Sequence, residues 1–458
     1  MMESSLSCHA VRLQNMKWED SSFWVLIGNA FLVFLLLSLY SCKDEEEDEW
    51  IPEVDYSVYD TDESEFHVAS LTIDTENGQR VEGKKNKDYL SCQVQVTSEK
   101  KEWNTTCTGR IRGRGNSTWK WYDKKPYRLT LDESLSLLGL PEGNDWVLLA
   151  NYRDPTDMLN TFAFALGASA GLPFTNHTRY VELTLNGEYM GLYQLTEQVM
   201  VGKGRVDIDE EKGILLSLDK NDGPKMSPNA KDNFWSAIYK LPVCVKHPND
   251  STSEQLEQVR QELAKLEQAI QAHDFEQLSR LMDVDAFADF MLIEEIVGNK
   301  ELTGPRSMYI FRDEGGLWTM GPLWDFDAAY GLDWHKMRYS HHFFDDPNLM
   351  IMGTAPATHK DAWKAVSGFF VDMWANADFV ALVQNRWQLM KPHIIDDCWT
   401  ETLKYYKGAS DALDRDAIRW PIDKNHRTEI YRMGKWLAER IDYLDKVVAQ
   451  YSSHTVTN

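Results

Sequence analysis

Cysteine is scarce in this 458-residue sequence, and the six that occur stand far apart. None of them forms a CxxC pair or the paired CxxC/HxxxH spacing that presents four ligands to a structural zinc ion. The neighbouring His341 and His342 have no further ligand at a suitable spacing. The sequence therefore argues against zinc chemistry.

Basic residues are also in short supply. The chain has 48 Lys and Arg against 72 Asp and Glu, which gives a net charge of −24. A surface with this excess of negative charge repels the phosphate backbone of nucleic acids. We therefore expect no nucleic-acid partner.

The signatures of common hydrolases are missing as well. The sequence contains no G-x-S-x-G elbow, no Ser/His/Asp series and no internal repeat. Apolar residues, in contrast, are plentiful, at 43% with 12% aromatic. This composition supports hydrophobic cores and excludes a disordered chain, a collagen-like chain or a disulfide-stapled miniprotein. The length predicts roughly two or three folded units.

The longest uncharged run covers residues 23–40. Its length suits either a signal-peptide core or a membrane-spanning helix. The LYSC sequence that ends at Cys42 resembles the lipobox of a bacterial type II signal peptide, so residues 1–41 are predicted to be removed and Cys42 lipidated. The alternatives are an uncleaved anchor with an incidental cysteine, and a true start at Met16.

Residues 43–49 form an acidic block, and residues 42–66 lack a steady periodicity. Like charges repel one another, so we interpret this segment as an extended linker. An acidic block just behind a lipidated cysteine resembles surface lipoproteins of the Bacteroidetes, which implies an outer-membrane anchor and exposure at the cell surface. The alternative is a simple tether.

The next part of the chain is rich in strand signals. Alternating or β-branched runs predict an antiparallel region over residues 67–150, a hairpin at Asn186-Gly187 and a further strand at 214–219. The runs of the antiparallel region are residues 69–73, 89–96, 108–111, 127–131 and 146–150.

Helical periodicity dominates the later part. We expect helices over residues 156–170, 252–282 and 284–295, and a mostly helical tail from residue 362. The helix at 252–282 is expected to pack on the domain, with a coiled-coil dimer as the alternative.

These elements predict an α+β fold. A sheet-rich lobe at about 67–220 and a helical lobe at about 250–458 are expected to form one two-lobed domain over 67–458, with a cleft between the lobes.

Residues 109–119 combine three glycines and three arginines in an acidic protein. Glycines let backbone amides approach an anion, and arginines donate forked hydrogen bonds to phosphate. The segment is thus a candidate phosphate-binding loop, and a structural β-turn is the alternative. Downstream, Lys125 precedes a proline that fixes the entry to a strand, where a lysine can reach a nucleotide phosphate.

The strongest acidic signal is WDFD, with Asp325 and Asp327 two residues apart between aromatic residues. Two such carboxylates can share a divalent cation, and Mg²⁺ prefers one or two carboxylates plus phosphate oxygens and water. Asp side chains that cap turns are the alternative. Upstream, Asn299 and Glu301 occupy a loop before a strand and are candidates for a metal ligand and a base.

Six motifs in this order resemble the CotH kinase family over residues 67–335. They are GRGNSTW, KKPYRL, the segment from Leu138 to Asn151, ELTLNGEYMGLY, TEQ and GPLWDFDAAYG. The resemblance implies a secreted or surface atypical protein kinase, distantly like protein kinases in fold, that transfers the γ-phosphoryl group of ATP to Ser or Thr with Mg²⁺ or Mn²⁺.

The resemblance also implies roles for individual residues. Lys125 would bind the ATP phosphates, Asp325 and Asp327 would hold the metal, and Arg114 and Asn116 would belong to the nucleotide loop. The chain departs from the family's N-x-D pattern at Glu301, whose side chain is one methylene longer than Asp. A displacement near 1 Å costs about a hundredfold in rate. The competing hypothesis is therefore an inactive surface protein on the same fold that binds a protein or a glycan, and a weaker one is a structural surface-layer component.

Overall fold

The computed structural model describes residues 66–332, 341–348 and 367–450. The chain divides into two units at Pro52/Glu53, and all the described residues belong to the second. The predicted signal peptide, the lipidation site Cys42 and almost all of the predicted linker lie outside them. Within the described ranges, no helix is both long and apolar enough to cross a membrane.

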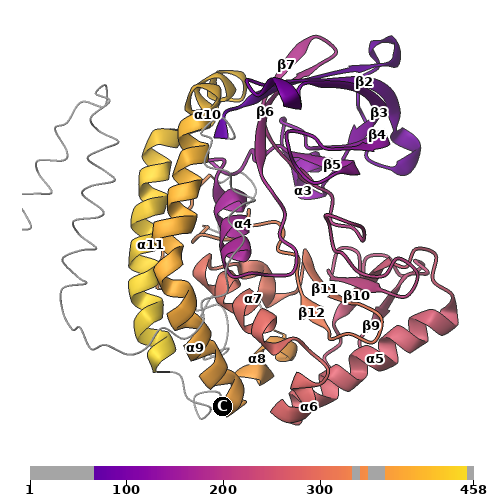
Figure 1. The fold of residues 1–458 in the computed structure, drawn as a ribbon, viewed down its shortest axis with the longest axis vertical. Helices are drawn as coiled ribbons and strands as arrows, with labels where there is room; N and C mark the ends of the chain where they lie inside the picture. Colours follow the sequence, from indigo (N-terminus) through magenta and orange to yellow (C-terminus); the bar gives the residue numbers. More distant parts are fainter. Residues whose placement is uncertain (1–65, 333–340, 349–366, 451–458) are drawn as a thin grey trace, which may run out of the picture. The chain divides into compact units, whose positions relative to one another are not determined.

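Seven strands close into a barrel in the order β1-β2-β3-β4-β5-β7-β6 (Figure 1). Neighbours pair antiparallel, except for the parallel pair of β1 with β6. The strands are β1 (Ala69–Thr75), β2 (Leu90–Thr97), β3 (Thr105–Gly113), β4 (Tyr127–Leu135), β5 (Gly143–Leu149), β6 (Arg179–Leu185) and β7 (Glu188–Glu197).

Alternation of side chains accounts for the barrel. In β1, every second residue is buried, including Leu71 and Ile73, which pack with Val94 and Trp146 in the barrel core. The predicted hairpin is confirmed, because Asn186 and Gly187 both adopt positive φ, of 52° and 78°, between β6 and β7. All five runs predicted for residues 67–150 fall in barrel strands, to within one residue at their ends.

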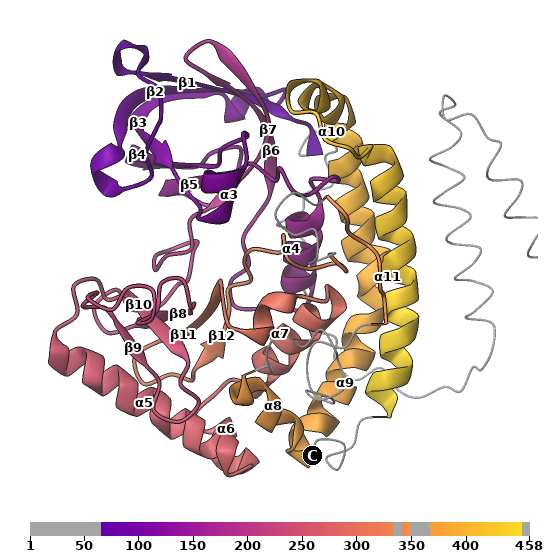
Figure 2. The same ribbon diagram turned by 180° about the vertical axis from the view of Figure 1, so that it is seen from behind.

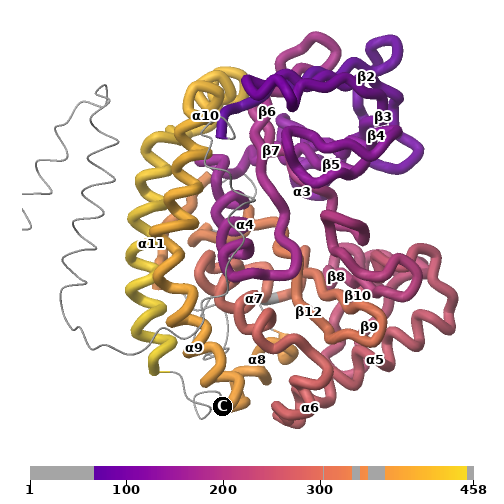
Figure 3. Tube along the Cα trace, in the orientation of Figure 1, coloured from indigo at the N-terminus to yellow at the C-terminus, as the bar shows by residue number. Residues whose placement is uncertain are grey.

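A second sheet has the order β12-β11-β8-β10-β9, with all neighbours antiparallel. Its strands are β8 (Ile214–Leu218), β9 (Asn233–Trp235), β10 (Pro242–His247), β11 (Met308–Arg312) and β12 (Thr319–Met320). The strand predicted at 214–219 is confirmed as β8. β10 was not predicted, although Val243 and Val245 alternate with polar or small residues. The trace in Figure 3 leads from β7 to β8, so the chain passes directly from the barrel to this sheet.

Helices make up most of the remaining structure. The α-helices are α3 (Ser117–Trp121), α4 (Leu159–Ser169), α5 (Ser253–Gln271), α6 (Phe275–Ser279), α7 (Val284–Ile296), α8 (Gly368–Trp374), α9 (Ala377–His393), α10 (Thr400–Arg419) and α11 (His426–Ala449). Short 3₁₀ segments are η3 (Glu76–Gly78), η4 (Asn86–Asp88), η5 (Lys101–Trp103) and η6 (Lys300–Thr303), and a π-helical segment, η8 (Ile394–Trp399), joins α9 to α10. Figures 1 and 2 both show α11 beside α9 and α10.

The helix predicted over 252–282 is interrupted in the structure. His273 has a φ of 54°, which a helix does not accommodate, and Asp274 then caps α6 by accepting a hydrogen bond from Gln277 N at 2.9 Å. Leu263 and Leu266 of α5 are buried in the core. This confirms packing on the domain rather than a coiled-coil surface.

The fold is α+β, as expected. A large core joins α4 and α7 to the second sheet and to the C-terminal helices. Phe66, the last residue of the predicted linker, belongs to this core and packs its ring at 4.7 Å from that of Tyr405 in α10.

Candidate functional site

The WDFD segment follows β12 and is anchored on α4. Phe326 N donates a hydrogen bond to Asn160 Oδ1 at 3.2 Å, and Trp324 stacks on Phe164 with ring centroids 6.4 Å apart. Tyr330 Oη donates to Leu159 O at 2.7 Å just beyond. Because these contacts hold the aromatic residues inward, the carboxylates between them occupy fixed positions.

Asp325 lies in a strained and electrostatically unfavourable position. Its φ of 68° is rare for a residue with a side chain, and such strain gathers at functional sites. Burial, together with the negative charge of Asp327, raises the pKa of Asp325 to about 7. Ser307 Oγ donates a hydrogen bond to Asp325 Oδ2 at 3.0 Å, which partly opposes this shift.

Glu301 faces the same carboxylates from η6. Burial and the charges of Asp325 and Asp327 raise the pKa of Glu301 well above its usual value. Its Oε1 lies 3.4 Å from Arg306 Nη1, whereas its buried Oε2 has no hydrogen-bond partner among the described residues. Asn299 lies beside it, but its Oδ1 accepts a hydrogen bond from Glu301 N at 3.0 Å and so caps η6.

Asp219 lies with these carboxylates, although the sequence analysis did not predict it as a site residue. We call Asp219, Glu301, Asp325 and Asp327 the acidic group hereafter. Asp219 directly follows β8, and its Oδ2 accepts a hydrogen bond from Ser307 N at 3.3 Å. Burial raises its pKa, and its charge contributes to the raised pKa values of both Asp325 and Glu301. The pairing of Leu218 with Met308 places Asp219 next to Ser307. No local sequence motif predicts that strand register.

The glycine and arginine turn meets this group from the barrel side. Arg114 directly follows β3, and its guanidinium carbon lies 5.3 Å from the ring centroid of Trp324. Burial lowers the pKa of Arg114, and the charge of Asp325 opposes that shift. The two motifs that sequence analysis singled out therefore lie side by side.

Lys84 binds the glycine and arginine turn, and the sequence analysis did not predict this contact. Its Nζ donates hydrogen bonds to Gly115 O at 2.6 Å and to Asn116 Oδ1 at 2.8 Å. Burial lowers the pKa of Lys84, and Asp222 opposes this shift. Asn116 is exposed and uses its side-chain oxygen to bind Lys84.

Lys125 makes its contacts with α3. Its Nζ donates to Trp119 O at 2.8 Å and also to Tyr122 O. The preceding Lys124 is 1% exposed and forms an ion pair with Asp416 at 2.8 Å. The role of Lys125 as a phosphate ligand remains a prediction.

Asp327 is 28% exposed and lies 3.7 Å from Arg153, measured between Oδ2 and Nη1. The acidic group and its arginines thus form one charged site, which draws on the barrel, β8, η6 and the segment after β12.

The residues present fit a divalent cation, although they form no ready-made cage. No set of three or more His, Cys, Asp or Glu in the described ranges is arranged to hold a metal ion. Mg²⁺ needs only one or two carboxylates when phosphate oxygens and water complete its shell. Asp325 and Asp327, which repel each other, supply two, and a cation between them would relieve that repulsion.

The fold and the site define an α+β protein with a charged site suited to a cation and a phosphorylated ligand. A scan against protein-family models matches residues 111–444 to the family described as CotH kinase protein. The chain belongs to the CotH kinase family, which suggests an atypical kinase that uses ATP and a divalent metal. A search of curated proteins finds no match.

Proposed function

We propose that this protein is an atypical protein kinase that transfers the γ-phosphoryl group of ATP to Ser or Thr of surface or secreted proteins, with Mg²⁺ or Mn²⁺. The observation that carries the proposal is the meeting of Arg114 with Trp324 and Asp325. It brings a phosphate-binding cation and the candidate metal carboxylates into one site. In this proposal, the barrel and the second sheet with its helices act as two lobes around that site.

The chemistry that these residues offer is mainly positioning and charge neutralisation. When bound, the divalent cation would be held by Asp325 and Asp327 and would neutralise phosphate charge. Arg114 donates forked hydrogen bonds to phosphate oxygens. Glu301 Oε2 takes the proton of the substrate hydroxyl while the new O–P bond forms and the bond from phosphorus to the ADP oxygen breaks.

The proposal includes the place of action. The lipobox-like sequence at Cys42 and the acidic block behind it support a lipid anchor in the outer membrane and exposure at the cell surface. Protein substrates in the same compartment follow from that placement.

The test is phosphoryl transfer by the full-length chain. With γ-labelled ATP and Mg²⁺ or Mn²⁺, the wild type is expected to label a protein acceptor, and Asp325→Asn to lose at least about 99% of that label. Asparagine keeps the shape and tolerates positive φ, so the variant isolates the charge. The matched control is Asp442→Asn, on the exposed face of α11, which is expected to keep full activity. Equal labelling by wild type and Asp325→Asn contradicts the proposal.

The second candidate is a binding protein without turnover, for a protein or glycan ligand. The contacts of Lys125 with carbonyl oxygens of α3 and of Glu301 with Arg306 favour it, since both engage groups that a kinase would use. Absence of label, together with no change of the unfolding temperature on adding ATP, would support this alternative.

A further inference from the structure

Arg153 is a buried cation with unused hydrogen-bond donors. Its side chain is only 8% exposed, and its Nε and Nη2 have no hydrogen-bond partner in the part of the chain that the structure describes. Its Nη1 lies 3.7 Å from Asp327 Oδ2, which is too long for a hydrogen bond. Buried guanidinium donors are costly when unpaired, so a ligand oxygen that reached these two atoms would stabilise them.

The loop around Arg153 holds it in place. The next residue, Asp154, accepts hydrogen bonds from Thr156 N at 2.8 Å and from Leu159 N at 2.9 Å, which ties the loop to the start of α4. The carbonyl oxygen of Arg153 itself accepts a hydrogen bond from His341 Nδ1 at 3.1 Å. The backbone that carries this side chain is thus fixed before any ligand arrives, which lowers the entropic cost of binding.

Arg153 and Arg114 flank the WDFD segment. Arg114 lies beside Trp324 and Asp325, whereas Arg153 lies beside Asp327. If Asp327 binds a cation, as proposed above, Arg153 loses the one acid with which it forms an ion pair in the described structure. An anion on the same side is then required to balance its charge.

Arg205 is a second buried arginine, and its contacts, unlike those of Arg153, are those of a structural residue. Arg205 also has an unpartnered Nη2 among the described residues, but its Nη1 donates to Gly204 O at 2.8 Å. Its guanidinium carbon lies 4.8 Å from the ring centroid of Trp146. Arg205 is therefore packed into the barrel end, away from the acidic group, and serves as a matched control.

We propose that Arg153 is a phosphate-binding residue that uses Nε and Nη2 to hold a phosphate oxyanion beside Asp327. The forked guanidinium matches two phosphate oxygens at once. The oxyanion belongs either to the triphosphate of a nucleotide or to a phosphorylated serine. Its assignment to a kinase reaction rests on the proposed function, but the binding of phosphate does not.

The test measures phosphate binding by the full-length chain without nucleotide, once with Mg²⁺ and once without metal. In isothermal titration calorimetry at about pH 7, Arg153→Gln is expected to weaken the binding of tripolyphosphate at least about tenfold. Arg205→Gln is expected to bind within about twofold of the wild type. Unchanged affinity in Arg153→Gln overturns the proposal.

Arg153→Lys is the control for a folding defect in Arg153→Gln. It keeps the buried positive charge but loses the fork, so about a threefold or greater weakening is expected, and unchanged affinity overturns the proposal. A parallel titration with O-phosphoserine separates the two sources: dependence on Arg153 for tripolyphosphate alone assigns the nucleotide, and dependence for phosphoserine assigns the product.

The same titration separates this inference from the kinase assignment. A protein that binds tripolyphosphate through Arg153 but transfers no phosphoryl group contradicts the proposed function and supports the subsite. A protein that transfers phosphate while Arg153→Gln binds tripolyphosphate normally contradicts the subsite alone.

Discussion

The carboxyl groups of the site are buried, and each lies close to other negatively charged carboxyl groups. Both effects disfavour the ionised form, and they raise the pKa values of Asp325 and Glu301. A site built in this way costs stability in the absence of ligands, which is the usual relation between function and stability at binding sites. Binding of a cation and of phosphate is therefore expected to stabilise the folded protein.

Glu301→Gln tests the proposed base. The variant removes the proton acceptor but keeps the shape and the hydrogen-bonding capacity of the side chain. We expect kcat to fall about 100-fold or more while KM for ATP stays within about twofold, because the base acts on the substrate hydroxyl. Steady-state kinetics with labelled ATP measure both constants.

The matched control for Glu301 is Glu401→Gln in α10. Burial also raises the pKa of this second glutamate, which for Glu401 reaches about 7, but Glu401 lies outside the acidic group. Normal kcat is expected for this control. A Glu301→Gln enzyme with wild-type kcat would remove Glu301 from the mechanism.

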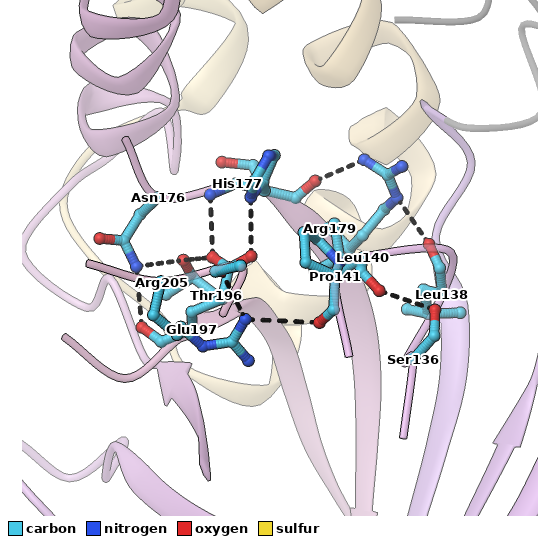
Figure 4. Close-up of polar contacts among 12 residues, drawn as sticks. Ser136, Leu138, Leu140, Pro141, Asn176, His177, Arg179, Thr196, Glu197 and Arg205 are labelled. Atoms are coloured by element: carbon cyan, nitrogen blue, oxygen red, sulfur yellow. Dashed lines mark hydrogen bonds and ion pairs between the residues drawn. The ribbon is translucent and has the colours of Figure 1, made fainter. Parts of the chain in front are cut away.

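Between elements, the end of β7 is held where the chain leaves the barrel. Figure 4 shows Glu197 facing His177, with Asn176, Thr196 and Arg205 around them. Glu197 is 0% exposed, its Oε1 lies 2.7 Å from His177 Nδ1, and its Oε2 accepts a hydrogen bond from His177 N at 2.9 Å. These contacts fix the start of the connection from β7 to β8.

Glu197→Gln is expected to make stability less dependent on acid pH. Burial alone would raise the pKa of Glu197, but the hydrogen bond and charge of His177 outweigh it, and the pKa ends below its usual value of 4.5. The charged form therefore stabilises the fold above about pH 4.5, and this contribution is lost as the pH falls through the lower, folded-state pKa.

At pH 7, Glu197→Gln is expected to unfold about 1–3 kcal/mol more easily than the wild type. The difference should shrink as the pH falls from about 5 to about 3. Urea denaturation across this range measures it. A constant difference at all pH values would show that the carboxylate charge is irrelevant.

The packing of α4 against the WDFD segment leaves no room at Gly167. A Cβ there would lie 2.7 Å from Leu323 Cδ1 and 2.8 Å from Thr175 Oγ1. Gly167→Ala should therefore destabilise the fold by about 1–3 kcal/mol, despite the better helix propensity of Ala, and reduce activity by displacing the segment. Thermal denaturation and labelling assays measure the two effects.

Gly316→Ala is the control for Gly167→Ala, because its Cβ would meet only ordinary contacts, at 3.5 Å or more. It is expected to change stability by less than about 0.5 kcal/mol. If Gly167→Ala is as stable and active as this control, α4 does not constrain the site.

Across the molecule, one buried ion pair connects the barrel to the C-terminal helices. Lys124, just before β4, pairs with Asp416 of α10 at 2.8 Å and is 1% exposed. Asp416 Oδ1 also accepts a hydrogen bond from Leu192 N of β7 at 2.7 Å. The barrel is thus connected to the C-terminal helices as well as to the second sheet.

Lys124→Met should leave Asp416 buried without its cation. A cost of about 3–5 kcal/mol in unfolding free energy is expected, because a broken buried pair is worse than none. Lys125→Met, one residue away and bonded to α3, should cost less than about 1.5 kcal/mol. Urea unfolding compares the two, and equal losses would argue against a role of the pair in joining the parts.

Local patterns were sufficient for much of the fold. The barrel strands, the Asn186-Gly187 hairpin and the tail helices inside the described ranges follow from alternation, turn residues and helical spacing. The split between α5 and α6 and the strand β10 were not predicted, because the first depends on the backbone at His273 and the second on pairing with β8 and β9.

The sequence by itself determined the chemical types of the site: paired carboxylates at WDFD, a glutamate after Asn299, and arginines among glycines. Only the tertiary structure decided that Asp219, Lys84 and Arg153 join them. Charge and burial act through space over a few ångströms, whereas a motif reports only neighbours along the chain. Residues a hundred positions apart therefore share a site for reasons that no local pattern contains.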